Sequence, residues 1–298
     1  MSVPESLAAP ERPRSPESLV ENVVRLVSLP EVCIRVNELI EDPAVSVTEI
    51  GRVVAQDAAL TARLLKVVNS PFYGYAGRID TIERAVTVIG MHDLRVLILA
   101  TAAVHAFSRI PQDLVNMASF WRHSAYTATM ARLIAARADV LHPERLFVAG
   151  LLHDIGQLVH CLEIPDVVRE VLVAGGEDEL AQGQLERELL GFSHADTGAA
   201  LLRAWRLPEW LARVCEHHHD PEAAGRYVLD ASIVHAADAL VSHVDRGVAP
   251  ADALDAVAPA ARELCGLDVD GIDDLAMDAA LGLADALEVV IPSAHQAR

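Results

Sequence analysis

Apolar residues recur along most of the chain at the three- and four-residue spacing of amphipathic helices. Residues 18–21 and 46–49 both have the Ser-x-x-Glu order of a capping box, and each precedes such a run. The second run continues to Val68 and ends in the segment 69–74, which contains proline and glycine. Further helices are predicted over residues 80–90, 92–107, 117–139, 143–159, 165–175, 180–190, 194–205, 208–217, 227–245, 250–264 and 271–290.

The chain lacks the sequence signs of strands. No segment alternates apolar and polar residues over a strand length, no hairpin dipeptide separates two apolar runs, and no glycine-rich phosphate loop is present. The expected fold is therefore all-α. Residues 1–17 are rich in proline and charge and are expected to be a disordered tail. An interruption near 108–116 separates two helical parts, over 18–108 and 117–290, and 291–298 are expected to be a second tail.

The charge of the chain limits the classes of partner. It carries 43 acidic and 24 basic residues, a net charge of −19, and Lys66 is its only lysine. Nucleic acids and anionic lipid surfaces attract clustered Lys and Arg, so neither a nucleic acid nor a membrane is an expected partner. The longest apolar stretch, 96–104, is about half a membrane span, and the N-terminus has no signal-peptide core. With four widely separated cysteines and no disulfide pattern, a cytoplasmic protein is expected.

Thirteen histidines stand out in a chain that is 52% hydrophobic. His153 and Asp154 directly follow an apolar run, so a buried partner must satisfy both side chains. His123 lies early in a long predicted helix, His194 starts a shorter one, and the run 217–219 ends another. His235 and Asp238 lie one helical turn apart, on the same face of a further predicted helix. Imidazole and carboxylate ligands together suit zinc, iron or manganese.

Most of these residues also have a structural interpretation. Standing alone, His123 is more often a core histidine bonded to the backbone than a ligand. Asp196 has the position of a helix cap, and the run 217–219 suits the negative end of a helix dipole. The remaining histidines, including His160, are expected in structural or surface roles. Only the pair of His153 with the following aspartate lacks such an alternative, so the set is stronger than any single member.

The order of these motifs resembles the HDOD domain, a signalling-associated branch of the HD superfamily of metal-dependent phosphohydrolases and a relative of the HD-GYP phosphodiesterases. The segment GLLHDIG at 150–156 resembles the HD signature, and NSPFYG at 69–74 resembles a second HDOD motif. The resemblance extends from about residue 19 to residue 245. Its other segments are residues 29–30, 56–61, 82–90, 121–124, 194–198, 205–208 and 218–219.

The resemblance implies an HD-like helical bundle over 117–290, preceded by a helical lobe over 18–108. It also implies that one or more divalent ions (iron, manganese or zinc) are held by a set spread over several helices. That set is His123, His153, Asp154, His194, His218 and Asp238. Either His217 or His219 would complete the pair with His218, and the spacing leaves this choice open.

The sequence departs from the HD-GYP pattern at three places. Gln157 replaces the lysine three residues after the motif aspartate, and no Gly-Tyr-Pro loop follows the paired histidines. Ser119 stands where some members have an additional carboxylate ligand. Glutamine is neutral and brings no charge to a phosphate. The metal ligands are therefore retained while the contacts to a substrate phosphate are weakened.

Two functions follow from this combination. The favoured one is a cytosolic signalling module that acts through contacts with a protein partner and retains an HD-type metal site. The alternative is a metal-dependent phosphohydrolase or phosphodiesterase with a nucleotide or cyclic dinucleotide as ligand, in which the metal lowers the pKa of a bound water. The residues do not identify the partner, the ligand, the metal or the oligomeric state.

Overall fold

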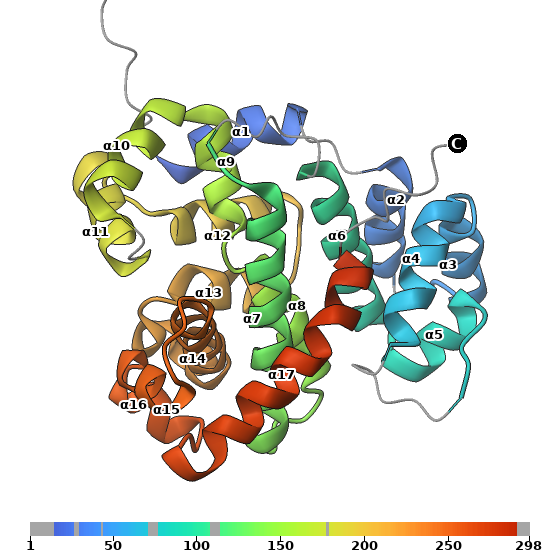
Figure 1. Ribbon diagram of the computed structural model, residues 1–298. Coiled ribbons are helices and arrows are strands. Elements are labelled where there is room, and N and C mark those ends of the chain that lie inside the picture. Colours follow the sequence, from blue (N-terminus) through green and yellow to red (C-terminus); the bar gives the residue numbers. More distant parts are fainter. Residues whose placement is uncertain are drawn as a thin grey trace, which may run out of the picture.

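The computed structural model describes residues 15–26, 30–42, 44–70, 77–107, 114–176 and 179–290, and these residues form helices and turns with no strand (Figure 1). The all-α prediction is confirmed for this part of the chain. The helices, with η for the 3-10 type, are α1 (Pro16–Leu26), α2 (Glu31–Ile40), α3 (Val47–Val54), α4 (Ala58–Val68), α5 (Ile82–Ile89), α6 (Met91–Phe107), α7 (Met117–Arg137), α8 (Glu144–Leu152), α9 (Ile155–Glu163), α10 (Pro165–Gly175), α11 (Glu179–Leu190), α12 (His194–Ala204), α13 (Glu209–His217), η1 (Pro221–Tyr227), α14 (Val228–Asp245), α15 (Pro250–Ala253), η2 (Leu254–Ala256), α16 (Pro259–Leu264) and α17 (Val269–Val290).

Helices α2 to α6 lie together on one side of the molecule (Figure 1). Five successive residues of α6, 96–100, are buried, so apolar side chains surround this helix. A helix of this kind needs neighbours on all sides, and α6 packs on α2, α4, α5 and α8. It is therefore the core of this group and joins the group to the rest of the chain.

Helix α7 is the centre of the larger group of helices. It packs on α8, α14 and α17, and buries Trp121, Met130 and Ile134. Helix α17 runs along α7 and also contacts α4, whereas α1 packs on α9 and α12 (Figure 1). The predicted division into parts over 18–108 and 117–290 stays a prediction.

Several helix predictions need correction. The run expected over 46–68 is two helices, because Asp57 accepts hydrogen bonds from two backbone N–H groups at the start of α4. The helix expected over 143–159 is α8 and α9, separated by the His-Asp pair. The helix expected over 250–264 is α15, η2 and α16, and α2 was not predicted.

The two predicted capping boxes differ in outcome. Ser46 caps α3, since its hydroxyl accepts a hydrogen bond of 3.2 Å from the Glu49 N–H. The box at Ser18 is wrong, because α1 already begins at Pro16 and the Ser18 hydroxyl donates to the backbone oxygen of Ser15. The proline-rich tail expected over 1–17 lies mostly outside the described residues.

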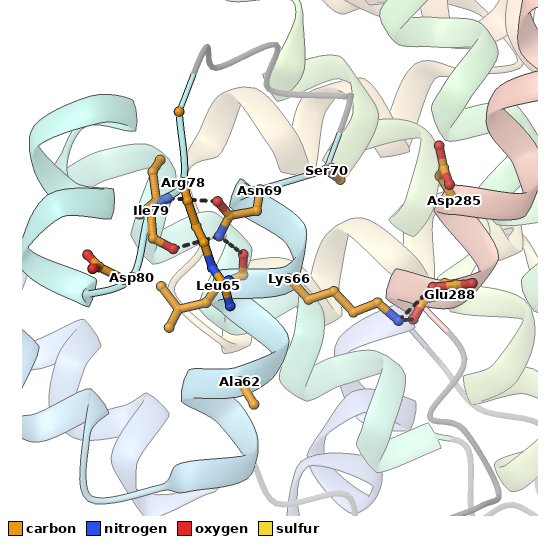
Figure 2. A pocket seen from close by; sticks show the side chains of 11 residues that line it. Ala62, Leu65, Lys66, Asn69, Ser70, Arg78, Ile79, Asp80, Asp285 and Glu288 are labelled. Carbon is orange, nitrogen blue, oxygen red and sulfur yellow. Dashed lines mark hydrogen bonds and ion pairs between the residues drawn. The ribbon is translucent and has the colours of Figure 1, made fainter.

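Asn69 holds the end of α4 (Figure 2). Its side-chain nitrogen donates to the backbone oxygens of Leu65 and Ile79 at 2.6 and 2.7 Å. Its side-chain oxygen accepts from the Ile79 N–H at 2.7 Å. This residue of the NSPFYG segment therefore ties α4 to the chain ahead of α5, and residues 71–74 lie outside the described part.

A cleft of about 750 Å³ lies between α4, residues 77–80 and α17 (Figure 2). Lys66 crosses it, with Nζ 3.0 Å from the Glu288 carboxylate and 2.9 Å from the backbone oxygen of that residue. The cleft contains no histidine among its lining residues. It is therefore separate from the predicted metal ligands.

No single helix in the described ranges is both long and apolar enough to cross a membrane, although two sharply bent helix pairs meet the limits of length and composition together.

Two glycines of the GLLHDIG segment determine how closely the helices approach. A Cβ atom at Gly150 would lie 2.7 Å from the Ala128 Cα of α7. A Cβ atom at Gly156 would overlap the backbone oxygen of His194 on α12 and lie 2.6 Å from the Gly198 nitrogen. Backbone atoms cannot turn away as a side chain can, so glycine at these positions lets α8 and α9 pack directly on their neighbours.

We expect Gly156→Ala to lower the free energy of unfolding by about 1–3 kcal/mol or more, since the added methyl group separates α9 from α12. Gly183→Ala on α11 is the matched control, because its Cβ atom would meet only ordinary contacts at 3.9 and 4.0 Å. Alanine favours a helix interior over glycine by about 1 kcal/mol, so this control should keep or raise stability. Urea unfolding followed by circular dichroism measures both. Equal stability of Gly156→Ala and the wild type would contradict the close helix contact.

Candidate metal centre

The HD pair lies in the turn between α8 and α9. Asp154 has φ −100° and ψ 10°, outside regular helical geometry, and α9 begins at the next residue. Both side chains are buried, with His153 0% and Asp154 3% exposed. The pair therefore occupies a bend, which corrects the expectation that both residues project from one continuous helix.

The Oδ1 atom of Asp154 faces histidines from α12 and from the end of α13. The Nε2 atoms of His194 and His218 lie 3.4 and 3.5 Å from this oxygen. Nε2 of His219 lies 3.1 Å from Nε2 of His194. The ligand atoms that these four residues offer all lie within 4.8 Å of one another. One ion fits between them.

The Oδ2 atom of Asp154 faces a second group. Nε2 of His153 lies 3.3 Å from this oxygen and 3.7 Å from Oδ1 of Asp238 on α14. Nε2 of His123 on α7 lies 3.2 Å from the same Asp238 oxygen. The ligand atoms of His123, His153 and Asp238 also lie within 4.8 Å of one another. Asp154 thus stands between two groups and presents one oxygen to each.

Backbone contacts orient two of the imidazole rings. Nδ1 of His153 lies 2.8 Å from the Gly150 oxygen, and Nδ1 of His218 lies 2.7 Å from the Cys215 oxygen. Because a carbonyl oxygen only accepts, Nδ1 carries the hydrogen in both rings. The lone pair of the neutral ring is then on Nε2, which faces the group. Metal-binding histidines are typically fixed by such a contact of the opposite nitrogen.

Three buried atoms of these groups have no hydrogen-bond partner in the part of the chain that the structure describes. They are Nε2 of His153, Nε2 of His218 and Oδ1 of Asp154. Unsatisfied buried polar atoms cost free energy, and one cation in each group would satisfy all three. Imidazole nitrogens and carboxylate oxygens suit zinc, iron and manganese, so the residues fit the expected ions without selecting one.

The pKa values follow from burial and opposite charge. Burial alone would raise the pKa of Asp154 and lower those of His153 and His194. Opposite charges overcome it: His153 holds the pKa of Asp154 well below its ordinary value, while Asp154 and Glu186 hold those of the two histidines well above theirs. Burial prevails at His218 and lowers its pKa. The Asp154 carboxylate is therefore ionised, and its negative charge requires a protonated histidine or a metal cation beside it.

Glu186 on α11 contacts Nδ1 of His194, the ring nitrogen opposite the one that faces Asp154. One carboxylate oxygen accepts from the backbone N–H of His194 and lies 2.7 Å from its Nδ1. The other lies 3.2 Å from Nδ1 of His160, whose Nε2 is 2.9 Å from the Thr197 hydroxyl. Burial would raise the pKa of Glu186, but His194 and His160 hold it well below its ordinary value. His160 thus has the structural role expected of it.

The face of α11 toward the histidines was not predicted. Glu179, Gly183 and Glu186 follow one another at four- and three-residue spacing, so they share one face. Glu179 offers an oxygen within 4.8 Å of the ligand atoms of His123 and Asp154. Burial, reinforced by the charge of Asp238, raises the pKa of Glu179 to about 8. Two carboxylates and a glycine on one face of a helix were the signal available in the sequence.

All six predicted ligands lie in the two groups, and their binding of metal stays a prediction. The structure adds His219 and leaves His217 outside, where its Nε2 lies 3.8 Å from Glu216. His235, another early candidate, is structural: its Nδ1 lies 2.8 Å from the His218 oxygen and its Nε2 accepts from the Ala258 N–H.

Two other residues singled out in the sequence lie outside the groups. Asp196 caps α12, because its carboxylate accepts from the backbone N–H of Ser193 at 2.8 Å. Ser119, one turn before His123, is exposed and brings no ligand.

We expect Glu186→Gln to weaken divalent metal binding by about 10- to 100-fold, because the amide no longer fixes the ring of His194 as a charged acceptor does. Glu188→Gln is the matched control, since Glu188 is exposed on the same helix. Competition for the metal with a chromophoric chelator gives both affinities. Unchanged affinity in Glu186→Gln would show that this carboxylate does not support the centre.

The family model of the HDOD domain matches residues 26–221. A Shewanella amazonensis SB2B protein, provisionally named a phosphohydrolase, has a solved structure that is 27% identical, with a TM-score of 0.68 over 91% of this chain and 96% of that chain. A Geobacter sulfurreducens HDOD domain protein of unknown function is 28% identical, with a TM-score of 0.65 over 93% of this chain and 98% of that chain.

A curated relative, the cyclic di-GMP phosphodiesterase CdgJ of Vibrio cholerae, is 27% identical over 161 residues, which are 51% of this chain and 34% of that protein. The chain spans less than half the length of the curated relatives it matches. The family match covers about two thirds of the chain and includes five of the six predicted ligands. The chain belongs to the HDOD domain family.

Proposed function

We propose that this HDOD protein is a cytoplasmic regulatory module, built around a centre for two divalent metal ions, that acts through contacts with a partner protein. The observation that carries the proposal is the position of Asp154, which presents one oxygen to each of two buried histidine-containing groups. Carboxylates that bridge two ions are placed in this way. His194, His218 and His219 would hold one ion, and His123, His153 and Asp238 the other.

The ligands come from five places in the fold, so bound ions would join these places. His123 belongs to α7, the HD pair to the α8–α9 turn, His194 to α12, His218 follows α13 and Asp238 belongs to α14. When bound, the ions supply positive charge to the buried carboxylates and act as Lewis acids. The side chains of the protein position this charge and exclude water from it.

The space beside the centre favours regulation over turnover. The cavity that borders Asp238 and His219 has a volume of about 50 Å³. Pockets for small organic ligands are typically about 300–1000 Å³, so a nucleotide does not fit. Gln157, half-buried on α9, brings no positive charge toward a phosphate.

Exposed apolar side chains on α10 and α11 support contacts with a protein. Leu172 and Val173 on α10 and Leu180 on α11 are exposed, at 40%, 87% and 48%. Helices α10 and α11 pack on each other, and exposed apolar side chains on neighbouring helices offer a contact surface to a protein partner. Because the matched curated relatives are more than twice as long as the matched region, such a module also occurs within longer chains.

The second candidate function is that of a metal-dependent phosphodiesterase acting on a cyclic dinucleotide. The similarity to CdgJ favours it, and so does the set of buried ligands, which could present a metal-bound water to phosphorus. This function requires the cavity beside Asp238 to widen several-fold.

Metal analysis and a hydrolysis assay on the same purified protein separate the two functions. We expect close to two equivalents of iron, manganese or zinc per chain, lost in His153→Ala. We also expect cyclic di-GMP hydrolysis by the wild type no faster than by His153→Ala. Turnover by the metal-loaded wild type that His153→Ala abolishes would replace the regulatory module with the phosphodiesterase. Metal content near zero after reconstitution would remove both functions.

A further inference from the structure

The buried residues of helix α11 include a carboxylate and no large apolar side chain. Gly183 and Glu186 are its buried residues, and Leu180 is 48% exposed. Most helices are held by an apolar stripe that faces the core. Leu190, at the end of α11, packs against the apolar core only partly buried, so the contacts of the α11 carboxylates contribute to the attachment of this helix.

Glu179 extends this polar face by one turn, toward the open side of the centre. Its ligand oxygen lies within 4.8 Å of those of His123 and Asp154. The Ser242 hydroxyl lies 3.3 Å from Oε2 of Glu179 and 3.4 Å from Oδ1 of Asp238, and donates to one or the other. Glu179 is therefore held at the edge of the second group of ligands by a residue of α14.

The same carboxylate lines the small cavity beside the centre. The wall of that cavity includes Glu179, Asp238, Ser242 and His219. An anion that approached the second group from this side would meet the Glu179 carboxylate together with the ligands Asp238 and His219. A carboxylate oxygen and a phosphate oxygen compete for the same position on a hard divalent cation.

We propose that Glu179 is a further ligand of the metal centre, which occupies the coordination position facing the cavity and thereby keeps phosphate and similar anions off the metal. This inference rests on the proposed metal centre and deepens it. It makes the resting protein closed to phosphate compounds, and it makes the position of α11 depend on the bound ion.

Cobalt(II) reports directly on this position, because its visible absorption changes with the ligands bound to it. We expect the spectrum of cobalt-loaded wild type to be insensitive to inorganic phosphate. Glu179→Ala opens one coordination position, so phosphate should shift its spectrum and bind about tenfold or more tightly than to the wild type, while cobalt binding weakens about tenfold. Glu188→Gln, an exposed change on α11, should behave as the wild type.

Hydrogen exchange provides the second readout. The amides of α11 should exchange faster in cobalt-loaded Glu179→Ala than in cobalt-loaded Glu188→Gln, and removal of the metal from the wild type should also speed their exchange.

The outcomes separate this inference from the function on which it rests. If the wild type binds cobalt, and if phosphate changes the spectra of the wild type and Glu179→Ala equally, only the role of Glu179 is overturned. Failure of the wild type to bind cobalt, iron, manganese or zinc overturns the metal centre itself and the inference with it. A phosphate response in Glu179→Ala alone, with faster exchange in α11, supports both.

Discussion

The Asp154 carboxylate, enclosed by histidine rings and 3% exposed, is the constraint on which the rest of this structure depends. A buried charge costs several kcal/mol unless opposite charge and hydrogen bonds surround it. Here the compensation comes from His153 beside it, from His194 on α12 and from His218 after α13, so these parts of the chain must meet at one point. Gly150 and Gly156 make that approach possible by letting α8 and α9 contact the backbone of α7 and α12. The close packing of these helices and the geometry of the site therefore depend on each other.

Where the signal was local or motif-like, the sequence predicted most helices and the residues that the structure brings together around Asp154. Three- and four-residue spacing identified most helices, and the chemistry of a buried His-Asp pair pointed to a cation. The breaks were harder to predict: Asp57 ends a continuous apolar run by capping the next helix, and the HD pair bends the chain although the residues around it suit a helix. Local capping and tertiary contacts override periodicity at such points.

The missed residues needed three-dimensional information. His217 and His219 flank His218 symmetrically in the sequence, and only the direction of the chain after α13 brings His219 to His194. Glu179, Gly183 and Glu186 share one face of their helix, but the sequence alone does not show that this face meets the histidines rather than solvent. Their role appears only when α11 lies against the histidines. In the proposed centre, Glu186 supports the ring of His194 and Glu179 occupies the position that faces the cavity.

The proposed two-ion centre would account for the buried histidines and carboxylates beside a cavity that does not admit a nucleotide. The most direct test is anomalous diffraction from crystals of manganese- or iron-loaded protein. We predict two peaks about 3.5–4 Å apart, one beside His194 and His218, the other beside His123 and Asp238, with Asp154 in contact with both ions. A single peak, or peaks that do not contact Asp154, would contradict the account.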